Sequence, residues 1–259
     1  MKQEIELLHS FSLTDFKSRH RGSALGFLWL LLTPCILLLI YTFVFGIVFE
    51  RSFDKPNSHS IFDYAIGLFI GISIFQIFSN SIATTPHSII GKPNFIKKIK
   101  FPLYILPIST VLSGSVVALV NLGLITSISI ITINSVGFRI LYIVPVVLTS
   151  IFFACSIGLL LSAISVYLRD VVQMSSFLNL ALMFSSGIFY LPEEIPTSYY
   201  TFLKFNPIIH LVDIARKIIL WNEQFSYLLL FLLSIISVLC LFISYRIFLY
   251  MKSSFPDAI

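Results

Sequence analysis

The sequence predicts an all-α polytopic membrane protein with six transmembrane helices, from its composition, its hydropathy and the length of its apolar runs. Of the 259 residues, 57% are hydrophobic and 11% are charged, and the mean hydropathy is +0.96, which lies far outside the range of soluble globular domains. A spanning helix needs roughly 20 mainly apolar residues. The stretches that meet this length are about 25–49, 62–84, 103–133, 140–167, 171–190 and 225–250.

Residues 1–24, ahead of the membrane domain 25–259, predict an amphipathic helix that lies in the headgroup plane on the cytoplasmic side. Apolar and charged side chains alternate there, and Ser12 and Asp15 fit a capping box that would begin a second helical half. Such a helix serves either as a membrane anchor or as a docking surface for a cytoplasmic protein. A cleavable signal peptide is not expected, because the apolar run that follows is too long. The apolar side chains are Ile5, Leu8, Phe11 and Phe16.

The placement of charge predicts that both termini are cytoplasmic. Six spans put the termini on one side of the membrane, and the short loop 91–100 on that side carries four lysines. The loop 50–63, on the other side, balances its two cations with Glu50, Asp54 and Asp63. Because cytoplasmic loops are enriched in lysine and arginine, the net charge of +5 indicates topology rather than an acidic partner.

The chain lacks the residues with which membrane proteins drive transport or catalysis by themselves. No charged residue need lie near the bilayer centre, which argues against a proton-driven pump. Gly91-Lys92 is the one Gly-Lys pair, and its surroundings do not fit a phosphate-binding loop. The five histidines lack metal-ligand spacing, and the three cysteines lie apart within apolar runs. We therefore expect no catalytic residue, metal or cofactor on this chain, and a second polypeptide that hydrolyses nucleotide.

The loop 85–102, TPHSIIGKPNFIKKIKFP, is basic and bounded by prolines, yet it carries five large apolar side chains. A loop that only joined two helices would not need an apolar face, so we expect a short helix that contacts a partner protein. The alternative is a basic loop on anionic lipid, worth about 1 kcal/mol per cation. The apolar residues are Ile89, Ile90, Phe95, Ile96 and Ile99.

The segment 191–224 predicts re-entrant helices at the outer mouth of a pathway. Three prolines divide it, and its apolar stretch 208–220 is too short to span the bilayer. Three polar residues recur within that stretch at helical spacing and share one face. The alternative is an interfacial helix on the outer leaflet. The prolines are Pro192, Pro196 and Pro207, and the polar face is His210, Asp213 and Lys217.

Uncharged polar residues repeat at helical spacing on the second, third and fifth spans, as Ser73, Gln76, Asn80 and Thr84 do on the second. They serve either as hydrogen bonds between helices or as the wall of a conduit for a neutral, hydrated substrate. Aromatic rings along the first and fifth spans suit sugar rings as well as lipid interfaces. Gly67-x-x-x-Gly71 permits close helix approach, but the spacing is too common to assign a contact. The candidate pathway residues are Trp29, Tyr41, Phe49, Phe177, Asn179, Phe184 and Tyr190.

Three motifs occur in one order along the chain. They are RHRGSALGFLWLLLTP at 19–34 with DFK before it, VYLRDV at 166–171, and SSGIFYLPEEIP at 185–196 followed by FNPIIHLVDIAR at 205–216. Together they resemble the permease subunit of bacterial polysaccharide-exporting ABC transporters of the type 2 exporter family. The resemblance covers essentially the whole chain, and in this register it is specific to the family but not to a substrate.

The resemblance implies a homodimer of six-helix subunits in the bacterial inner membrane, paired with two copies of a separate ABC ATPase that binds ATP and Mg. It implies export of a long glycan, often on an undecaprenyl pyrophosphate carrier, and of the O-antigen type. The amino-terminal helix and the cytoplasmic loops would receive the motion of the ATPase, and the re-entrant helices would gate the periplasmic exit. The implied coupling residues are Lys92, Lys97, Lys98, Arg169 and Asp170, and the implied gate residues are Pro192, Pro196, Pro207, His210, Asp213 and Arg216.

Lys17, Arg19 and Arg21 form the basic cluster ahead of the first span. Our hypothesis is that they hold the pyrophosphate of the lipid carrier, because guanidinium groups make paired hydrogen bonds to phosphate. Positive-inside anchoring and docking to the ATPase are the alternatives. The rival functions are export of teichoic acid, capsular polysaccharide or a small lipophilic drug by the same architecture, a membrane enzyme acting on lipid-linked sugars, and a scaffold without transport.

Overall fold

The computed structural model describes residues 2–20, 25–49, 53, 61–92, 101–133 and 138–255, and every regular element within these ranges is helical. Short 3-10 turns or π turns extend several of the α-helices. In chain order the elements are α1 (Lys2–His20), η1 (Gly26–Leu28), α2 (Trp29–Tyr41), η2 (Thr42–Val48), α3 (Ile61–Ile90), α5 (Ile105–Ile133), η3 (Phe138–Tyr142), α6 (Ile143–Tyr167), α7 (Val171–Ser185), η4 (Pro192–Glu194), α8 (Thr197–Leu203), α9 (Pro207–Arg216), η5 (Lys217–Trp221) and α10 (Tyr227–Lys252).

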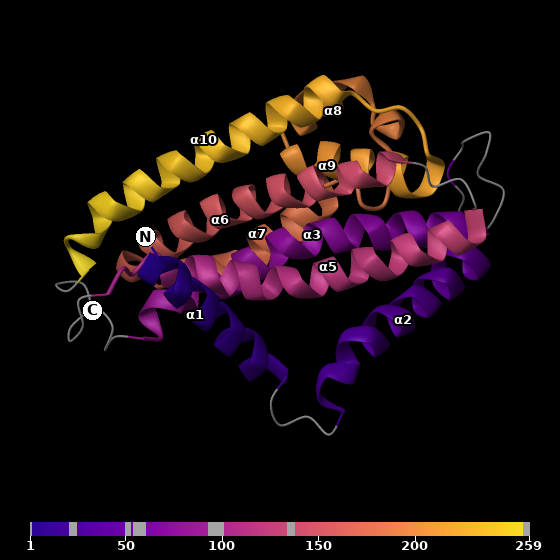
Figure 1. Ribbon diagram of the computed structural model, residues 1–259. Helices are drawn as coiled ribbons and strands as arrows, with labels where there is room; N and C mark the ends of the chain where they lie inside the picture. The colour runs from indigo at the N-terminus through magenta and orange to yellow at the C-terminus, as the bar shows by residue number, and fades with distance from the viewer. Residues whose placement is uncertain are drawn as a thin grey trace.

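Helix α3 is the centre of the bundle, and α5, α6, α7 and α9 pack around it. Figure 1 shows α3, α5 and α6 running along the molecule together, with α10 crossing outside α6. Buried residues make up 78% of the most apolar window of α3 but only 11% of that of the segment Gly26–Val48. Since α2 is as apolar as a core helix, its exposed surface faces lipid or another protein rather than water.

Among the residues that the structure describes, five helices are long and apolar enough to cross a membrane, one fewer than the six spans that the sequence predicts. They are Gly26–Val48, Asp63–Ile90, Ile105–Ile130, Phe138–Tyr167 and Tyr227–Lys252. The predicted fifth span, 171–190, is wrong in length, because α7 ends at Ser185 and rises only about 22 Å. Gly187 follows with a φ of +65°, the left-handed conformation that ends many helices.

Two smaller expectations near the chain's polar segments are also corrected. The predicted capping box at Ser12 is wrong, since α1 runs without a break and Ser12 Oγ donates to Leu8 O at 2.7 Å. Residues 85–90, predicted as part of a loop, are the last turns of α3. There Ser165 Oγ of α6 donates to Pro86 O at 2.8 Å, so the extension is held by its neighbour.

Both chain ends lie at the same end of the bundle, as the N and C labels of Figure 1 show. A second apolar cluster packs there, separate from the main core around α3. We call this region the terminal end. The buried members of its cluster are Ile89, Leu103, Leu106, Leu159, Ala163, Val166, Phe248 and Phe255.

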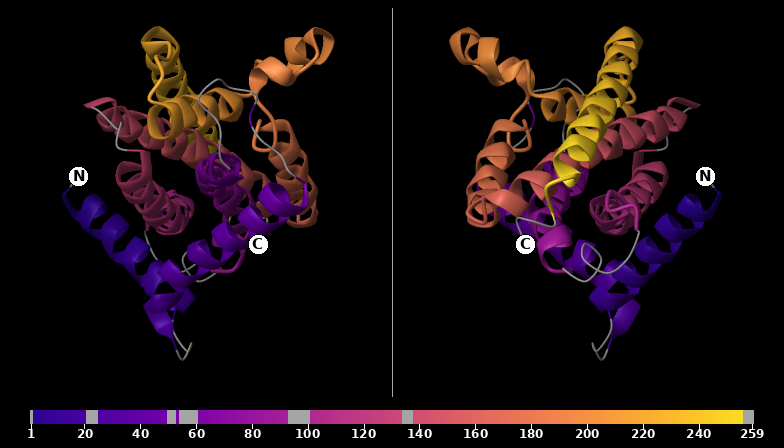
Figure 2. Two further views of the ribbon diagram at one scale, coloured as in Figure 1. Left: turned by 90° about the vertical axis from the view of Figure 1, so that its right-hand side faces the viewer. Right: turned by 90° about the vertical axis from the view of Figure 1, so that its left-hand side faces the viewer.

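Figure 2 shows the molecule along the direction of the long helices, from both sides. Helices α1 and α2 diverge from each other below the bundle like the arms of a V, and α8 projects on the opposite side. Helix α1 packs on α5. The projecting elements are therefore α1, α2 and α8, and α8 belongs to the segment 191–224, which we call the outer segment. Both regions are among those for which the sequence predicts function.

Candidate functional site

Arg19, a predicted phosphate or ATPase contact, is held by its own helix and by α3. Its guanidinium pairs with the Asp15 carboxylate at 2.9 Å and donates from Nη1 to Asn80 Oδ1 at 3.4 Å. The same carboxylate accepts a hydrogen bond from Ser113 Oγ on α5. The charge of Arg19 is thus already matched by Asp15, and both Arg19 and Lys17 are exposed. Arg21 lies outside the described residues.

The Asp15–Arg19 pair contacts Asn80 of α3 and Ser113 of α5. Both contacts lie about one hydrocarbon thickness from the far end of their helix. From Asn80 to Ile61 on α3, and from Ser113 to Ile133 on α5, the helix rises about 30 Å at 1.5 Å per residue. The hydrocarbon core of a bilayer is also about 30 Å thick. The Asp15–Arg19 pair therefore lies about one hydrocarbon thickness from the far ends of α3 and α5, a spacing that suits an interface helix.

The first half of α1 docks on the residues just before α5. The Phe11 and Phe101 ring centroids are 5.2 Å apart, and Lys92 Nζ lies 5.8 Å from the Phe11 ring. Tyr104 Oη donates to Glu4 Oε1 at 2.8 Å. This bond lowers the pKa of Glu4, and burial together with the bond raises the pKa of Tyr104 to about 12.

The predicted coupling residues Arg169 and Asp170 are exposed in the turn between α6 and α7. The turn is tied to the carboxyl-terminal segment, because Tyr167 Oη donates to Met251 O at 2.8 Å and the Tyr167 ring packs 6.0 Å from Phe255. Lys92 is exposed at the same terminal end. Lys97 and Lys98 lie outside the described residues.

Three predicted pathway residues, Tyr41, Phe49 and Phe184, are brought together by two rings that the prediction does not include. Phe45 lies 6.3 Å from Tyr41, 5.9 Å from Phe49 and 6.4 Å from Phe189, and Phe189 lies 5.6 Å from Phe184. The spacing 41, 45, 49 places one ring on each helical turn, so it could have identified Phe45.

The remaining pathway candidates lie on α2, on α7 and in the turn after α7. Trp29 is partly exposed at the start of α2, and Phe177 is 74% exposed on α7. Asn179 Oδ1 is buried without a hydrogen-bond partner among the described residues. Tyr190 Oη donates to Phe184 O at 2.7 Å. Phe177 also lines a groove of about 470 Å³ between α6 and α7, whose walls are almost entirely apolar.

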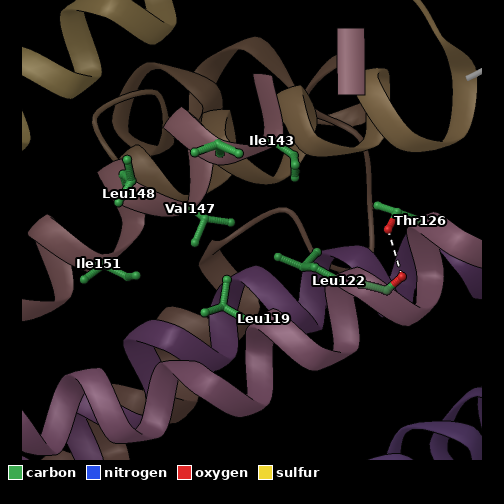
Figure 3. A pocket seen from close by; sticks show the side chains of 9 residues that line it. Leu119, Leu122, Thr126, Ile143, Val147, Leu148 and Ile151 are labelled. Atoms are coloured by element: carbon green, nitrogen blue, oxygen red, sulfur yellow. Dashed lines mark hydrogen bonds between the residues drawn. The ribbon is translucent and has the colours of Figure 1, made fainter. Parts of the chain in front are cut away.

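A second groove, of about 320 Å³, lies between α5 and α6 and is shown in Figure 3. Its walls are aliphatic, with Leu119, Val147 and Ile151 among them. The hydroxyl of Thr126 in the lining donates to Gly123 O at 2.9 Å, so it is satisfied within its own helix. The groove suits a hydrocarbon chain, and its walls do not suit the sugar or the pyrophosphate that the sequence analysis considers.

The three prolines of the outer segment lie at or directly before the first residue of a helix. Pro192 is the first residue of η4, Pro207 is the first residue of α9, and Pro196 directly precedes α8. A proline is suited to these positions, because the first backbone N–H groups of a helix have no partner within it. Helix α9 is ten residues long and largely buried, and it is too short to span the bilayer.

The predicted polar face of α9 is satisfied locally. Lys217 Nζ pairs with Asp213 at 2.7 Å, and His210 Nε2 hydrogen bonds with Lys204 O at 2.8 Å. In the described part of the chain, no three His, Cys, Asp or Glu side chains gather as metal ligands would. These residues therefore orient α9 and its flanking turns.

Arg216, at the end of α9, is completely buried. Its Nε donates to Gly67 O of α3 at 2.9 Å, and its Nη1 donates to Gly187 O at 2.8 Å and to Tyr190 O at 3.4 Å. Its Nη2 donates to Ile188 O. One guanidinium thus links three segments of the chain, an arrangement that the sequence prediction of a gate residue does not contain.

Gly71 makes room for this arginine, and Gly67 makes room for the Phe53 ring that packs on the arginine. A methyl group on Gly71 would lie 3.1 Å from Arg216 Nη2, and one on Gly67 would overlap the ring of Phe53. The Phe53 ring in turn lies 5.2 Å from the Arg216 guanidinium carbon. The Gly67-x-x-x-Gly71 spacing, which the sequence leaves unassigned, is therefore the signal that could have located the buried arginine.

Comparison with known proteins identifies the kind of protein to which this geometry belongs. Residues 7–220 match the family described as ABC-2 type transporter. An O-antigen export system permease protein of Myxococcus xanthus is 26% identical over 98% of this chain and 95% of its own length, and one of Klebsiella pneumoniae is 24% identical over 85% and 80%. A polysialic acid transport protein of Escherichia coli is 23% identical over 80% and 79%. The chain belongs to the ABC-2 type transporter family and is a multi-pass transport subunit rather than an enzyme.

Proposed function

We propose that this chain is the transmembrane permease subunit of an ATP-driven transporter that exports lipid-linked polysaccharide of the O-antigen type across the bacterial inner membrane. The observation that carries the proposal is the similarity to the Myxococcus O-antigen export permease over nearly the whole of both chains. ATP and Mg²⁺ would bind to a separate ABC ATPase, because the sequence has no phosphate-binding loop.

The surfaces of α2 and α7 support a homodimer with the pathway at its twofold interface. Most of the α2 span is exposed in the single chain, and α7 exposes Phe177 and Phe184. A twofold pair would cover both helices with the same surfaces of a second copy. The aromatic faces would then line a conduit in which sugar rings stack weakly at many points.

Cys35 provides a direct test of the dimer, because it is exposed on α2 while Cys155 is buried. A chain carrying Cys155→Ala and Cys240→Ala would keep Cys35 as its one thiol. We expect a bifunctional thiol reagent to give a covalent dimer in membranes, and Cys35→Ser to abolish that product. A monomer at every reagent length would contradict a pathway interface at α2.

The terminal end would be the cytoplasmic face that receives the ATPase. It presents α1, Lys92 and the turn with Arg169 and Asp170 together, so a push on any of them acts on one packed unit. The Asp15–Arg19 pair supports an anchoring role for Arg19. The exposed Lys17 is then the better candidate to meet the phosphates of an undecaprenyl pyrophosphate carrier.

Polysialic acid transport is the second candidate, favoured by the match of the Escherichia coli protein to four fifths of this chain. Both candidates share the permease architecture and differ in cargo. The sugar composition of the material retained in a deletion strain would distinguish them.

Deletion of the gene tests the function itself. We expect lipid-linked polymer to accumulate in the cytoplasm and to disappear from the cell surface, and the wild-type chain to restore it. The matched control is a strain that lacks the ATPase and should show the same accumulation. Unchanged surface polymer in the deletion strain would overturn the proposal.

A further inference from the structure

We propose that Arg216 is a positioning residue that joins α9 and the turn 185–190 into one unit, the gate body, which moves as a whole on a seat formed by Gly67 and Gly71 of α3. The inference rests on the proposed transport function, which requires the outer end of the bundle to open. During opening, the contacts between α9 and the turn 185–190 hold, and the contacts between the gate body and α3 break.

Side chains at both ends of α9 donate hydrogen bonds to the turn that follows α7. At the first end, Asn206 caps α9 by accepting a hydrogen bond from Ile208 N at 3.0 Å, and its amide nitrogen donates to Ser185 O at 2.9 Å. At the last end, Arg216 donates to Gly187 O and Tyr190 O. Two side chains of one helix therefore hold both sides of the same turn.

Separating α9 from the turn 185–190 is costly, because buried polar groups on both sides would lose their hydrogen-bond partners. The carbonyls of Gly187 and Ile188 follow the end of α7, and a carbonyl left without a donor at membrane depth is strongly disfavoured. Arg216 supplies donors to the carbonyls that follow α7. If α9 left the turn, a fully buried guanidinium and these carbonyls would lose their partners together, so the two parts move together.

The gate body also makes hydrogen bonds to α3, one of them from the same arginine. These bonds are Arg216 Nε to Gly67 O at 2.9 Å and Tyr64 Oη to Phe189 O at 3.1 Å. Around Gly71 the contact is close, since a methyl group there would lie 3.1 Å from Arg216 Nη2, 3.3 Å from Val212 Cγ1 and 3.4 Å from Ile188 Cα. Both parts of the body, α9 and the turn, thus rest on Gly71.

Two residues of α9 report separately on the two contacts. Ile209 packs inside the gate body, where its side-chain atoms lie 3.6 and 3.7 Å from a methyl position on Gly187, and Val212 packs on the seat at Gly71. Both side chains are 1% exposed or less. Ile209→Cys and Val212→Cys are therefore a matched pair on one helix that differ in the surface they face.

The experiment places each substitution in a chain with Cys35→Ser, Cys155→Ala and Cys240→Ala, assembled with its ATPase in membranes, and measures labelling by a maleimide. We expect ATP turnover to raise the labelling rate of Val212→Cys by about tenfold or more, because a buried thiol reacts only from an open state. The rate for Ile209→Cys should stay unchanged. Equal acceleration of both thiols would show that α9 leaves the turn, and no acceleration of either during measured turnover would show that the seat does not open. Each result overturns the proposal.

Arg216→Lys separates positioning from folding, because it keeps the charge but loses the planar fork of donors. In the assembled complex we expect it to expose Ile209→Cys to labelling without ATP, whereas Tyr64→Phe, which removes a bond to the seat alone, should not. Protection of Ile209→Cys in an Arg216→Lys chain would refute the role of the arginine. Labelling does not depend on the cargo, so a wrong assignment of the glycan would appear in the deletion strain and leave this result unaffected.

Discussion

Replacing Gly71 with alanine tests the seat under the buried arginine by size alone. The added methyl group would lie 3.1 Å from Arg216 Nη2, 3.3 Å from Val212 Cγ1 and 3.4 Å from Ile188 Cα. The guanidinium is held by carbonyls and the Cα belongs to the backbone, so neither can move away freely. Overpacking of this kind costs typically about 1–3 kcal/mol.

Alanine also favours a helix over glycine by up to about 1 kcal/mol, which would partly mask the cost. Gly123→Ala is the matched control, because Gly123 lies inside α5 and a methyl group there meets nothing within 4 Å. The difference between the two variants cancels the helix preference and leaves the packing cost of about 1–3 kcal/mol.

Thermal unfolding of the purified chain in detergent would measure this difference. A change of 1 kcal/mol shifts the melting temperature by about 2–4 °C for a chain of this size, so Gly71→Ala should melt about 2–12 °C below Gly123→Ala. Equal melting temperatures, or a higher one for Gly71→Ala, would refute the tight seat.

Three further predictions concern other contacts. Arg19→Ala should speed proteolysis of α1 by about fivefold or less, because an exposed ion pair is worth up to about 1 kcal/mol. Lys17→Ala should leave the rate unchanged. Equal effects of the two variants would contradict the anchoring role of Arg19. The bond from Tyr104 lowers the pKa of Glu4 below 4.5 and the pKa of Tyr104 is raised from 10.0 to about 12, so this contact should persist between about pH 4.5 and 10. The contact should weaken as the pH falls through the lowered pKa of Glu4 or rises toward 12. A spin label on the exposed Ser10 would detect the weakening as added mobility. Tyr104→Phe should remove this pH dependence. The buried hydroxyls of Ser156 and Ser244 lie 2.7 Å apart, so Ser156→Ala and Ser244→Ala should each cost about 0.6–1.7 kcal/mol; additive losses in the double variant would show that the pair does not interact.

The hydrogen-bonding role of the polar residues on α3 and α5 was open in the sequence and is decided by their neighbours. Asn121 Nδ2 donates to Gln76 Oε1 at 2.8 Å, and Asn80 Nδ2 donates to Gly114 O at 3.4 Å. Periodicity places such residues on one face of a helix. It does not say whether that face meets another helix or a conduit, because this depends on how the helices pack.

The sequence by itself determined the membrane class, four of the long spans almost to their ends, and the short pieces between Pro192 and Pro207. These follow from local rules, since hydrocarbon thickness sets the length of an apolar run and proline restricts where a helix can begin. Only the tertiary structure decided that α7 stops at Ser185, that Asp15 holds Arg19, and that Arg216 is buried. The physical reason is that the cost of a buried charge depends on the partners supplied by distant segments, and for Arg216 these are carbonyls of α3 and of the turn after α7.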